Sequence, residues 1–171
     1  PQINWESIYT ANSIEKAAYV LYDDSVEDTQ LTLNSIGNLS INDKLQADFG
    51  LTYKNLSSKN FAKIVDLMGA GFHEDVDPFS NTLNDVSGNV QKNEDDIFNY
   101  NYIIDASRFD AFTQLKYERD KWNAFLTGSF SNTNYQRNGL FQNGRFLDNS
   151  LGKSDNVQFS DYGIKAGFTY K

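Results

Sequence analysis

The chain has 171 residues, which is enough for one domain with a sizeable core. Aromatic residues make up 15% of it, Phe and Tyr far outnumber Trp, and only 2 prolines and 11 glycines occur, a mixture that favours pleated sheet over helix. A formal net charge of -8 without a basic stripe argues against nucleic acid as a partner, and the absence of cysteine excludes disulfides, thiolate metal sites and cysteine nucleophiles.

The first two predicted elements form a β-hairpin. Residues 29–41 place leucines on one face and Asn, Gln and Ser on the other, with Ile36 as the exception. In residues 45–56 apolar and polar side chains alternate strictly over the first nine positions. The short polar link at residues 42–44 consists of good turn formers, so we expect the two strands to pair.

The same period of two returns in the second half of the chain. It predicts strands near residues 109–119, 122–133 and 158–170, with a tight polar turn at residues 119–121. The expected fold is therefore all-β, an antiparallel meander of consecutive strands.

The predicted connections alternate between short turns and long polar segments near residues 57–108 and 133–157. Such alternation is typical of an outer-membrane barrel, which has tight periplasmic turns and extended extracellular loops. We therefore expect both long segments at one end of the sheet and the short turns at the other. Within the first long segment, residues 61–68 predict one or two helical turns, and residues 98–104 predict an extension of the next strand.

The apolar stripe along these strands has two interpretations. No apolar run approaches the roughly 20 residues of a membrane-spanning helix, whereas a barrel strand needs only about 10 alternating residues. One interpretation is the inner face of a soluble β-sandwich. The other is a lipid-facing barrel wall, which the continuously polar opposite face favours. Aromatic residues near strand ends fit the girdles of such a wall: Tyr53, Phe109, Tyr117, Trp122, Phe130 and Tyr170.

Residues that could carry chemistry are sparse. His73 is the only histidine, so a metal site or a catalytic triad would have to be built around it. Asp75 and Asp77 are close in sequence but lack the glycine and terminal Glu of an EF-hand loop, and we interpret them as solvated loop acids. We predict no catalytic residue, no metal site, no cofactor and no enzymatic activity.

Five segments carry a resemblance to a known family: Gln2–Tyr9, Ala17–Asp24, Ser129–Leu140, Asn143–Lys153 and Gly163–Lys171. They are similar to the barrel region of TonB-dependent receptors from Bacteroidetes, the SusC-like subgroup with a carboxypeptidase-regulatory-like extension before the plug. The resemblance implies a barrel of about 22 strands around a plug, in the bacterial outer membrane. Residues 1–171 would be only part of that wall, and we expect the chain to be a fragment of a larger protein, because open sheet edges in lipid leave backbone groups unpaired.

The resemblance also implies a function and partners. The expected function is import of a nutrient, with carbohydrate, peptide and metal chelate all left open. The expected partners are outer-membrane lipid and the TonB energy-transducing complex, reached through parts outside this chain, with a surface lipoprotein as a candidate. Two alternatives remain: a structural barrel that acts as a platform for a surface lipoprotein or a secretion assembly, and a soluble β-sandwich binding module.

Candidate ligand-binding residues are aromatic and cationic side chains of the second long segment: Tyr135, Arg137, Phe141, Arg145 and Phe146. Weaker candidates in the first long segment are Phe72, His73 and Phe79. Loops on a rigid scaffold commonly carry binding residues, and packing of these rings against one another within the loops is an equally good interpretation.

Overall fold

The computed structural model describes residues 2–12 and 15–170. These residues divide into two compact units. The loop unit comprises Pro1–Asp28, Ser58–Ile104 and Arg137–Asp155. The sheet unit comprises Thr29–Ser57, Asp105–Gln136 and Asn156–Lys171.

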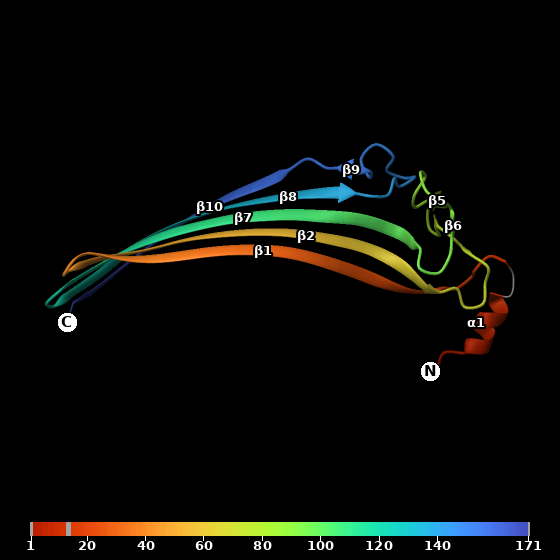
Figure 1. Ribbon diagram of the computed structural model, residues 1–171, viewed down its shortest axis with the longest axis horizontal. Helices are drawn as coiled ribbons and strands as arrows, with labels where there is room; N and C mark the ends of the chain where they lie inside the picture. The colour runs from red at the N-terminus through yellow and green to blue at the C-terminus, as the bar shows by residue number, and fades with distance from the viewer. Residues whose placement is uncertain (1, 13–14, 171) are drawn as a thin grey trace. The chain divides into compact units, whose positions relative to one another are not determined.

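Long antiparallel strands dominate the described chain (Figure 1). They are β1 (Leu21–Asn42), β2 (Leu45–Asp66), β7 (Ile97–Arg119), β8 (Trp122–Gly139) and β10 (Val157–Tyr170). Their order in the sheet is β1-β2-β7-β8-β10, so each strand lies beside its neighbour in sequence. The predicted all-β antiparallel meander is confirmed, and no sheet among the described residues is closed.

Several strand ends differ from the sequence prediction. Residues 61–68 do not form helical turns, because β2 continues to Asp66. The backbone there pairs with the turn just before β7: Ile64 N donates to Asp96 O at 3.0 Å, and Asp95 N donates to Ile64 O at 2.9 Å. The predicted extension of the next strand over residues 98–104 is confirmed, since β7 begins at Ile97.

The long connections are consequently shorter than expected. The first spans residues 67–96 instead of 57–108, and the second spans residues 140–156 instead of 133–157. Hydrophobic alternation marks only the part of a strand with one solvated and one apolar face, so it did not reveal these polar strand ends.

Short elements that the sequence did not predict organise the connections. They are α1 (Trp5–Ala11), β3 (His73–Glu74) with β6 (Gln91–Lys92), β4 (Val76–Asp77) with β5 (Thr82–Leu83), and β9 (Gly152–Lys153), which pairs with β8. The Asn4 side chain caps α1 by accepting a hydrogen bond from Ser7 N at 3.3 Å. None of the described helices has the length and apolar character to cross a membrane.

The loop unit contains the hydrophobic core. The core residues are Ala17, Ala62, Ile64, Leu67 and Phe98, with Phe61 and Met68 also buried. Asn12 is fully buried beside them, and its Nδ2 donates to Leu67 O at 2.9 Å while its Oδ1 accepts from Ala18 N at 2.8 Å. This amide ties the segment after α1 to the end of β2.

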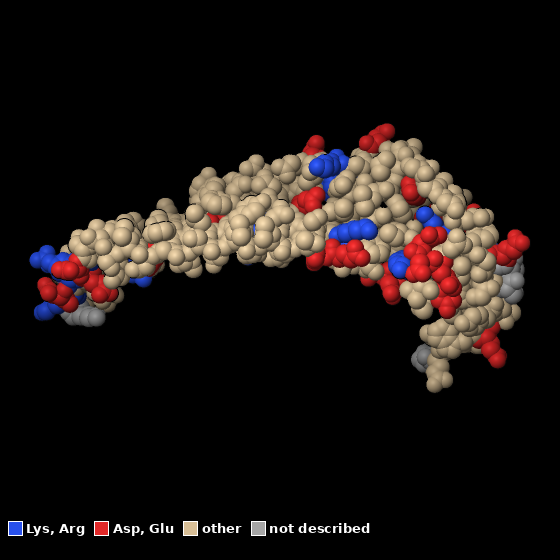
Figure 2. All heavy atoms as spheres, viewed as in Figure 1, with Lys and Arg blue, Asp and Glu red and all other residues tan. Residues whose placement is uncertain are grey.

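In the sheet unit, no hydrophobic side chain of the described residues is among the buried ones. Alternation along each strand separates a mainly apolar face from a mainly polar face, and the polar face also carries four exposed hydrophobic side chains, Ile36, Phe112, Phe125 and Phe159. The apolar face carries Leu31, Leu33, Leu39, Ile41, Phe49, Leu51, Tyr53, Leu115, Leu126, Tyr162, Ile164 and Phe168, all of them exposed. Figure 2 shows a largely uncharged band over the middle of these strands and a group of charged side chains at the end where the strands turn.

Candidate functional site

Arg137 has a structural role in the loop unit. Its Nη1 donates to Ser150 O at 2.9 Å and its Nη2 donates to Asn149 O. Its backbone N donates to Ser154 Oγ at 3.0 Å, and its backbone O accepts from Ser154 N at 2.8 Å. The guanidinium therefore holds the second long connection in place, which agrees with the interpretation that these side chains pack the loops. Two of its N–H groups, on Nη1 and Nη2, already donate hydrogen bonds.

Tyr135 belongs to the sheet unit, unlike the other four candidates. It lies on β8 opposite Val157 of β10, and its ring meets that of Phe159 edge to face with centroids 6.3 Å apart. Tyr135 and Ser131 lie on the same face of the sheet, the polar face. They are four residues apart on β8, and β8 pairs with β10 without interruption between them. The Tyr135 side chain is exposed, so its ring is accessible from that face.

Arg145 and Phe146 form a pair of their own. The Arg145 guanidinium lies 5.6 Å from the centroid of the Phe146 ring, a cation–π arrangement at the surface. The carboxyl group of Asp77 has a pKa below its usual range, chiefly because Ser80 Oγ and Phe79 N donate to it, with a smaller contribution from the charge of Arg145. Phe146 is more than half exposed.

The weaker candidates separate into packed and exposed side chains. His73 is half-buried and its ring meets Phe98 edge to face at 5.1 Å. Burial lowers the pKa of His73, and Asp75 partly opposes this. Phe72 is also half-buried, whereas Phe79 is 98% exposed.

The prediction that Asp75 is a solvated loop acid is wrong. Its side chain is 2% exposed, and its Oδ1 accepts from Asn84 Nδ2 at 2.9 Å and from Asn99 N at 2.9 Å. Its Oδ2 has no hydrogen-bond partner among the described residues, and Lys92 Nζ lies 4.0 Å from it. A buried carboxylate needs such partners, and sequence spacing could not reveal them because they come from three separate segments.

The loop unit also contains a small cavity of about 120 Å³ that the sequence analysis did not anticipate. It is lined by Asn84, Asn99, Tyr100, Asn101, Tyr102, Arg137, Phe141, Asn143 and Ser150. Two predicted candidates, Arg137 and Phe141, thus meet at one site, and Lys92 Nζ lies 5.3 Å from the Phe141 ring centroid. The one sequence signal for this cavity is the alternation of Asn and Tyr over residues 99–102.

A network of polar side chains crosses the polar face of the sheet unit. Asp48 on β2 accepts a hydrogen bond from Asn38 on β1 and forms an ion pair with Lys116 on β7 at 2.5 Å. Further along, Thr127 Oγ1 on β8 donates to Gln114 Oε1 on β7 at 2.9 Å. These side-chain contacts connect four neighbouring strands, β1, β2, β7 and β8, in addition to their backbone pairing.

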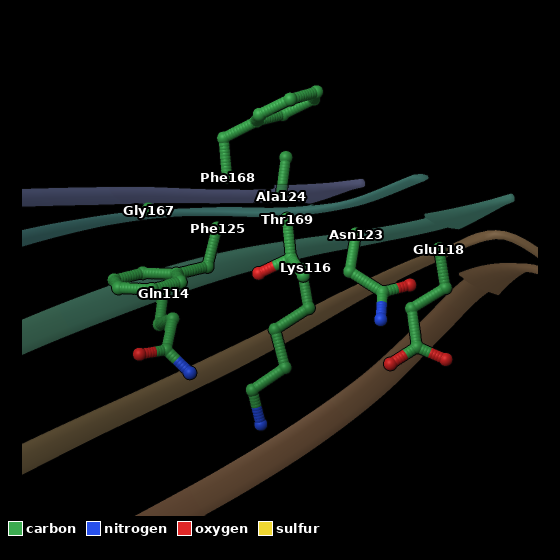
Figure 3. A pocket seen from close by; sticks show the side chains of 9 residues that line it. All are labelled: Gln114, Lys116, Glu118, Asn123, Ala124, Phe125, Gly167, Phe168 and Thr169. Atoms are coloured by element: carbon green, nitrogen blue, oxygen red, sulfur yellow. The ribbon is translucent and has the colours of Figure 1, made fainter. Parts of the chain in front are cut away.

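A hollow on the same face shows how the two sides of the sheet differ (Figure 3). The side chains of Gln114, Lys116 and Thr169 project to one side of the strands, whereas Ala124 and Phe168 project to the other. The polar side chains of this hollow therefore lie on one side of the strands, together with the apolar ring of Phe125.

The comparisons with known proteins gave no match, either to a protein-family model or to a curated protein. Among the residues that the structure describes, no three His, Cys, Asp or Glu side chains are grouped so that they could hold a metal ion. Function is therefore inferred from the arrangement of the residues themselves.

Proposed function

We propose that this chain is part of the wall of an outer-membrane β-barrel, and that the barrel is a TonB-dependent transport receptor of the SusC-like type that imports a nutrient. The observation that carries the proposal is the sheet unit's exposed and uncharged apolar face. Ile164 is 82% exposed and Tyr162 is 81% exposed, although both are large hydrophobic residues on a regular strand.

Such a face needs an apolar environment. Contiguous apolar patches above a few hundred Å² on a protein surface mark contacts with other proteins or with membranes. Between Leu31 and Ile41 on β1, and between Tyr162 and Tyr170 on β10, the apolar face carries no charged side chain. About 10 residues of tilted strand span the hydrocarbon layer, so both stretches have the length of a membrane-facing strand.

The polar face supports the same proposal. A barrel lumen holds water or a plug, and the Asn38–Asp48–Lys116 network would supply polar partners there. A soluble β-sandwich instead requires a second sheet packed on the apolar face. Among the described residues, the remaining sheets are two-stranded and lie in the loop unit, so neither is such a partner.

In this proposal the loop unit contributes to ligand contact on the extracellular side. Tyr135 on the polar face, together with Arg145 and Phe146 in the second connection, are the contact residues that remain accessible. Arg137 is instead a positioning residue, since its guanidinium holds the connection. Carbohydrate, peptide and metal chelate all remain ligand classes for this receptor.

A platform for a surface lipoprotein is the second candidate function. The observation in its favour is the exposure of Phe79 and Phe146 on the two long connections, because exposed aromatic side chains are common in protein interfaces. A platform barrel would bind a lipoprotein stably without taking up a small ligand.

Protease treatment of intact cells tests the proposal. The bonds of residues 67–96 and 140–156 should be cut, whereas the turns at Asp43 and Asp120 should be protected until the outer membrane is opened. Cleavage at those turns in intact cells would contradict the orientation. Recovery of the complete protein in the soluble fraction without detergent would contradict the membrane location itself.

A further inference from the structure

Three phenylalanine rings of the sheet unit each lie over a glycine of a neighbouring strand. The three pairs are Phe49 with Gly37, Phe112 with Gly50, and Phe125 with Gly167. A Cβ built on any of these glycines would lie within 3.0 Å of a ring carbon, closer than Cβ atoms come to other atoms in proteins. Each ring therefore occupies space that only a glycine leaves free.

Two of the pairs join strands that have no tight turn between them. Phe112 and Gly50 join β7 to β2, which are separated by the first long connection. Phe125 and Gly167 join β8 to β10, which are separated by the second long connection. In a β-hairpin the short turn fixes the register, that is, which residues of the two strands lie opposite each other. A long connection does not fix the register, so contacts between the strands have to do so.

Alternation of apolar and polar side chains does not exclude a shift of the register by two residues. A shift by one residue moves every side chain to the other face, whereas a shift by two leaves every side chain on its own face. Register is strongly specified where one face of a sheet is packed in a core. In the part of the sheet unit that the structure describes, no hydrophobic side chain is buried, so a contact that distinguishes individual positions is needed.

The pair of Phe125 with Gly167 distinguishes positions that are two residues apart. The two residues lie directly opposite each other in the antiparallel register of β8 with β10, at the edge of one hollow (Figure 3). The next positions on the same face of β10 are Lys165 and Thr169. A shift by two residues in either direction would therefore place a side chain where the Phe125 ring lies.

We infer that Phe112 and Phe125 are register-determining residues, which fix β7 on β2 and β10 on β8 by fitting over Gly50 and Gly167. Gly50 is likewise flanked on its own face by residues that have side chains. Offsets between neighbouring strands determine strand tilt and diameter in a closed barrel, so this role would matter to a barrel wall. The inference goes beyond the proposed transport function, because it concerns this sheet whether or not its apolar face lies in lipid.

Disulfide trapping in the complete protein tests the inference for β8 and β10. This chain has no cysteine, so after replacement of any cysteine outside it one is introduced at Asp161 and a second at Ser131, Ser129 or Thr133. Asp161 lies opposite Ser131, whereas Ser129 and Thr133 would lie opposite it only after a shift by two residues. Diagonal neighbours in a sheet are about 7 to 8 Å apart, which is too far for a disulfide.

Each double-cysteine protein is refolded from denaturant in detergent under oxidising conditions. The folded fraction is isolated, and mass spectrometry of its peptides gives the ratio of shifted to unshifted crosslinks. A lower folding yield therefore does not change the ratio.

The ratio should respond to the ring and to the glycine alike. Phe125→Leu removes the ring and Gly167→Ala blocks its place, so each should raise the ratio about fivefold, near the upper range for one cross-strand pair. Phe125→Tyr keeps the ring and should give the parent ratio. The matched controls are Gly128→Ala, where the added Cβ meets no heavy atom within 4 Å, and Phe168→Leu, whose ring packs on Trp122.

Both controls should also give the parent ratio. An unchanged ratio in Phe125→Leu or in Gly167→Ala would overturn the inference, and so would a fivefold rise in Phe125→Tyr or in either control.

Discussion

The two units of this chain place isoleucine side chains on their strands in opposite environments, one buried and the other exposed. In the loop unit Ile64 is 0% exposed and is part of a small core, whereas Ile164 in the sheet unit is 82% exposed. Hydrophobic burial is the dominant favourable contribution to folding in water. The loop unit therefore has a source of stability within itself, while the described residues of the sheet unit leave its apolar face uncovered.

Paired substitutions at these two isoleucines should give the largest contrast. Ile64→Ala removes fully buried methyl groups and should destabilise the loop unit by about 2 to 5 kcal/mol. Ile164→Ala leaves no cavity in a packed core and should cost only the lost transfer of its methyl groups from water into detergent, about 1 to 2 kcal/mol. Hydrogen exchange of peptides from each unit, in the complete protein in detergent, measures both effects. A cost of several kcal/mol at Ile164 would mean that a protein layer covers the apolar face.

A smaller difference in stability is expected when two glycines of β8 are each replaced by alanine. A Cβ built on Gly139 would lie 1.6 Å from Ser150 O, while one built on Gly128 has no heavy atom within 4 Å. Gly139→Ala should force the second connection away from β8, with a cost of about 1 to 3 kcal/mol. Gly128→Ala is the control and should be nearly neutral. Faster proteolysis of residues 140–156 in the Gly139 variant alone is the expected result, and equal rates would contradict the packing described here.

The smallest expected effect is the pH dependence of the loop unit. Burial lowers the pKa of His73 below its ordinary value of 6.5, with Asp75 and Glu74 opposing and Lys16 reinforcing that shift. Because the folded-state pKa is lower than the unfolded one, the stability from neutral His73 is fully present above pH 6.5 and is lost as pH falls towards the folded-state pKa.

A fluorophore on Phe79→Cys reports unfolding of the loop unit, since this position is 98% exposed and the chain contains no other cysteine. The urea midpoint should fall between about pH 7.5 and pH 5.5, and it should fall less when His73→Asn is also present. An equal fall in both proteins would show that other groups carry the pH dependence.

The same contrast explains which features could be predicted from the sequence. Period-two alternation reveals a strand when one of its faces is apolar and the other polar, so the strands of the sheet unit were predicted within a few residues. The end of β2 in the loop unit lacks that alternation and was predicted as helical turns, whereas residues 98–104 of β7 were predicted as an extension of that strand. The fold class was therefore predictable, while the strand ends depended on tertiary pairing.

The candidate site was less predictable. Tyr135, Arg145 and Phe146 have exposed side chains, whereas Arg137 is engaged by backbone carbonyl groups 12 to 13 residues away. Asp75 and its partner Asn84 are buried, and their burial depends on segments distant in sequence. Residue type alone could not distinguish these buried polar groups from solvated ones.

The most direct test of the central claim compares the two faces of β2 at neighbouring positions. A single Trp is placed at Leu51 or at Thr52 in the complete protein, with its other tryptophans replaced, and the protein is reconstituted in lipid vesicles that contain a lipid-soluble quencher. Leu51 lies on the apolar face and Thr52 lies on the polar face, where its Oγ1 is 3.1 Å from Asn34 Oδ1. We predict strong quenching at position 51 and little at position 52. Equal quenching at both positions, or none at either, would contradict the assignment of the apolar face to lipid.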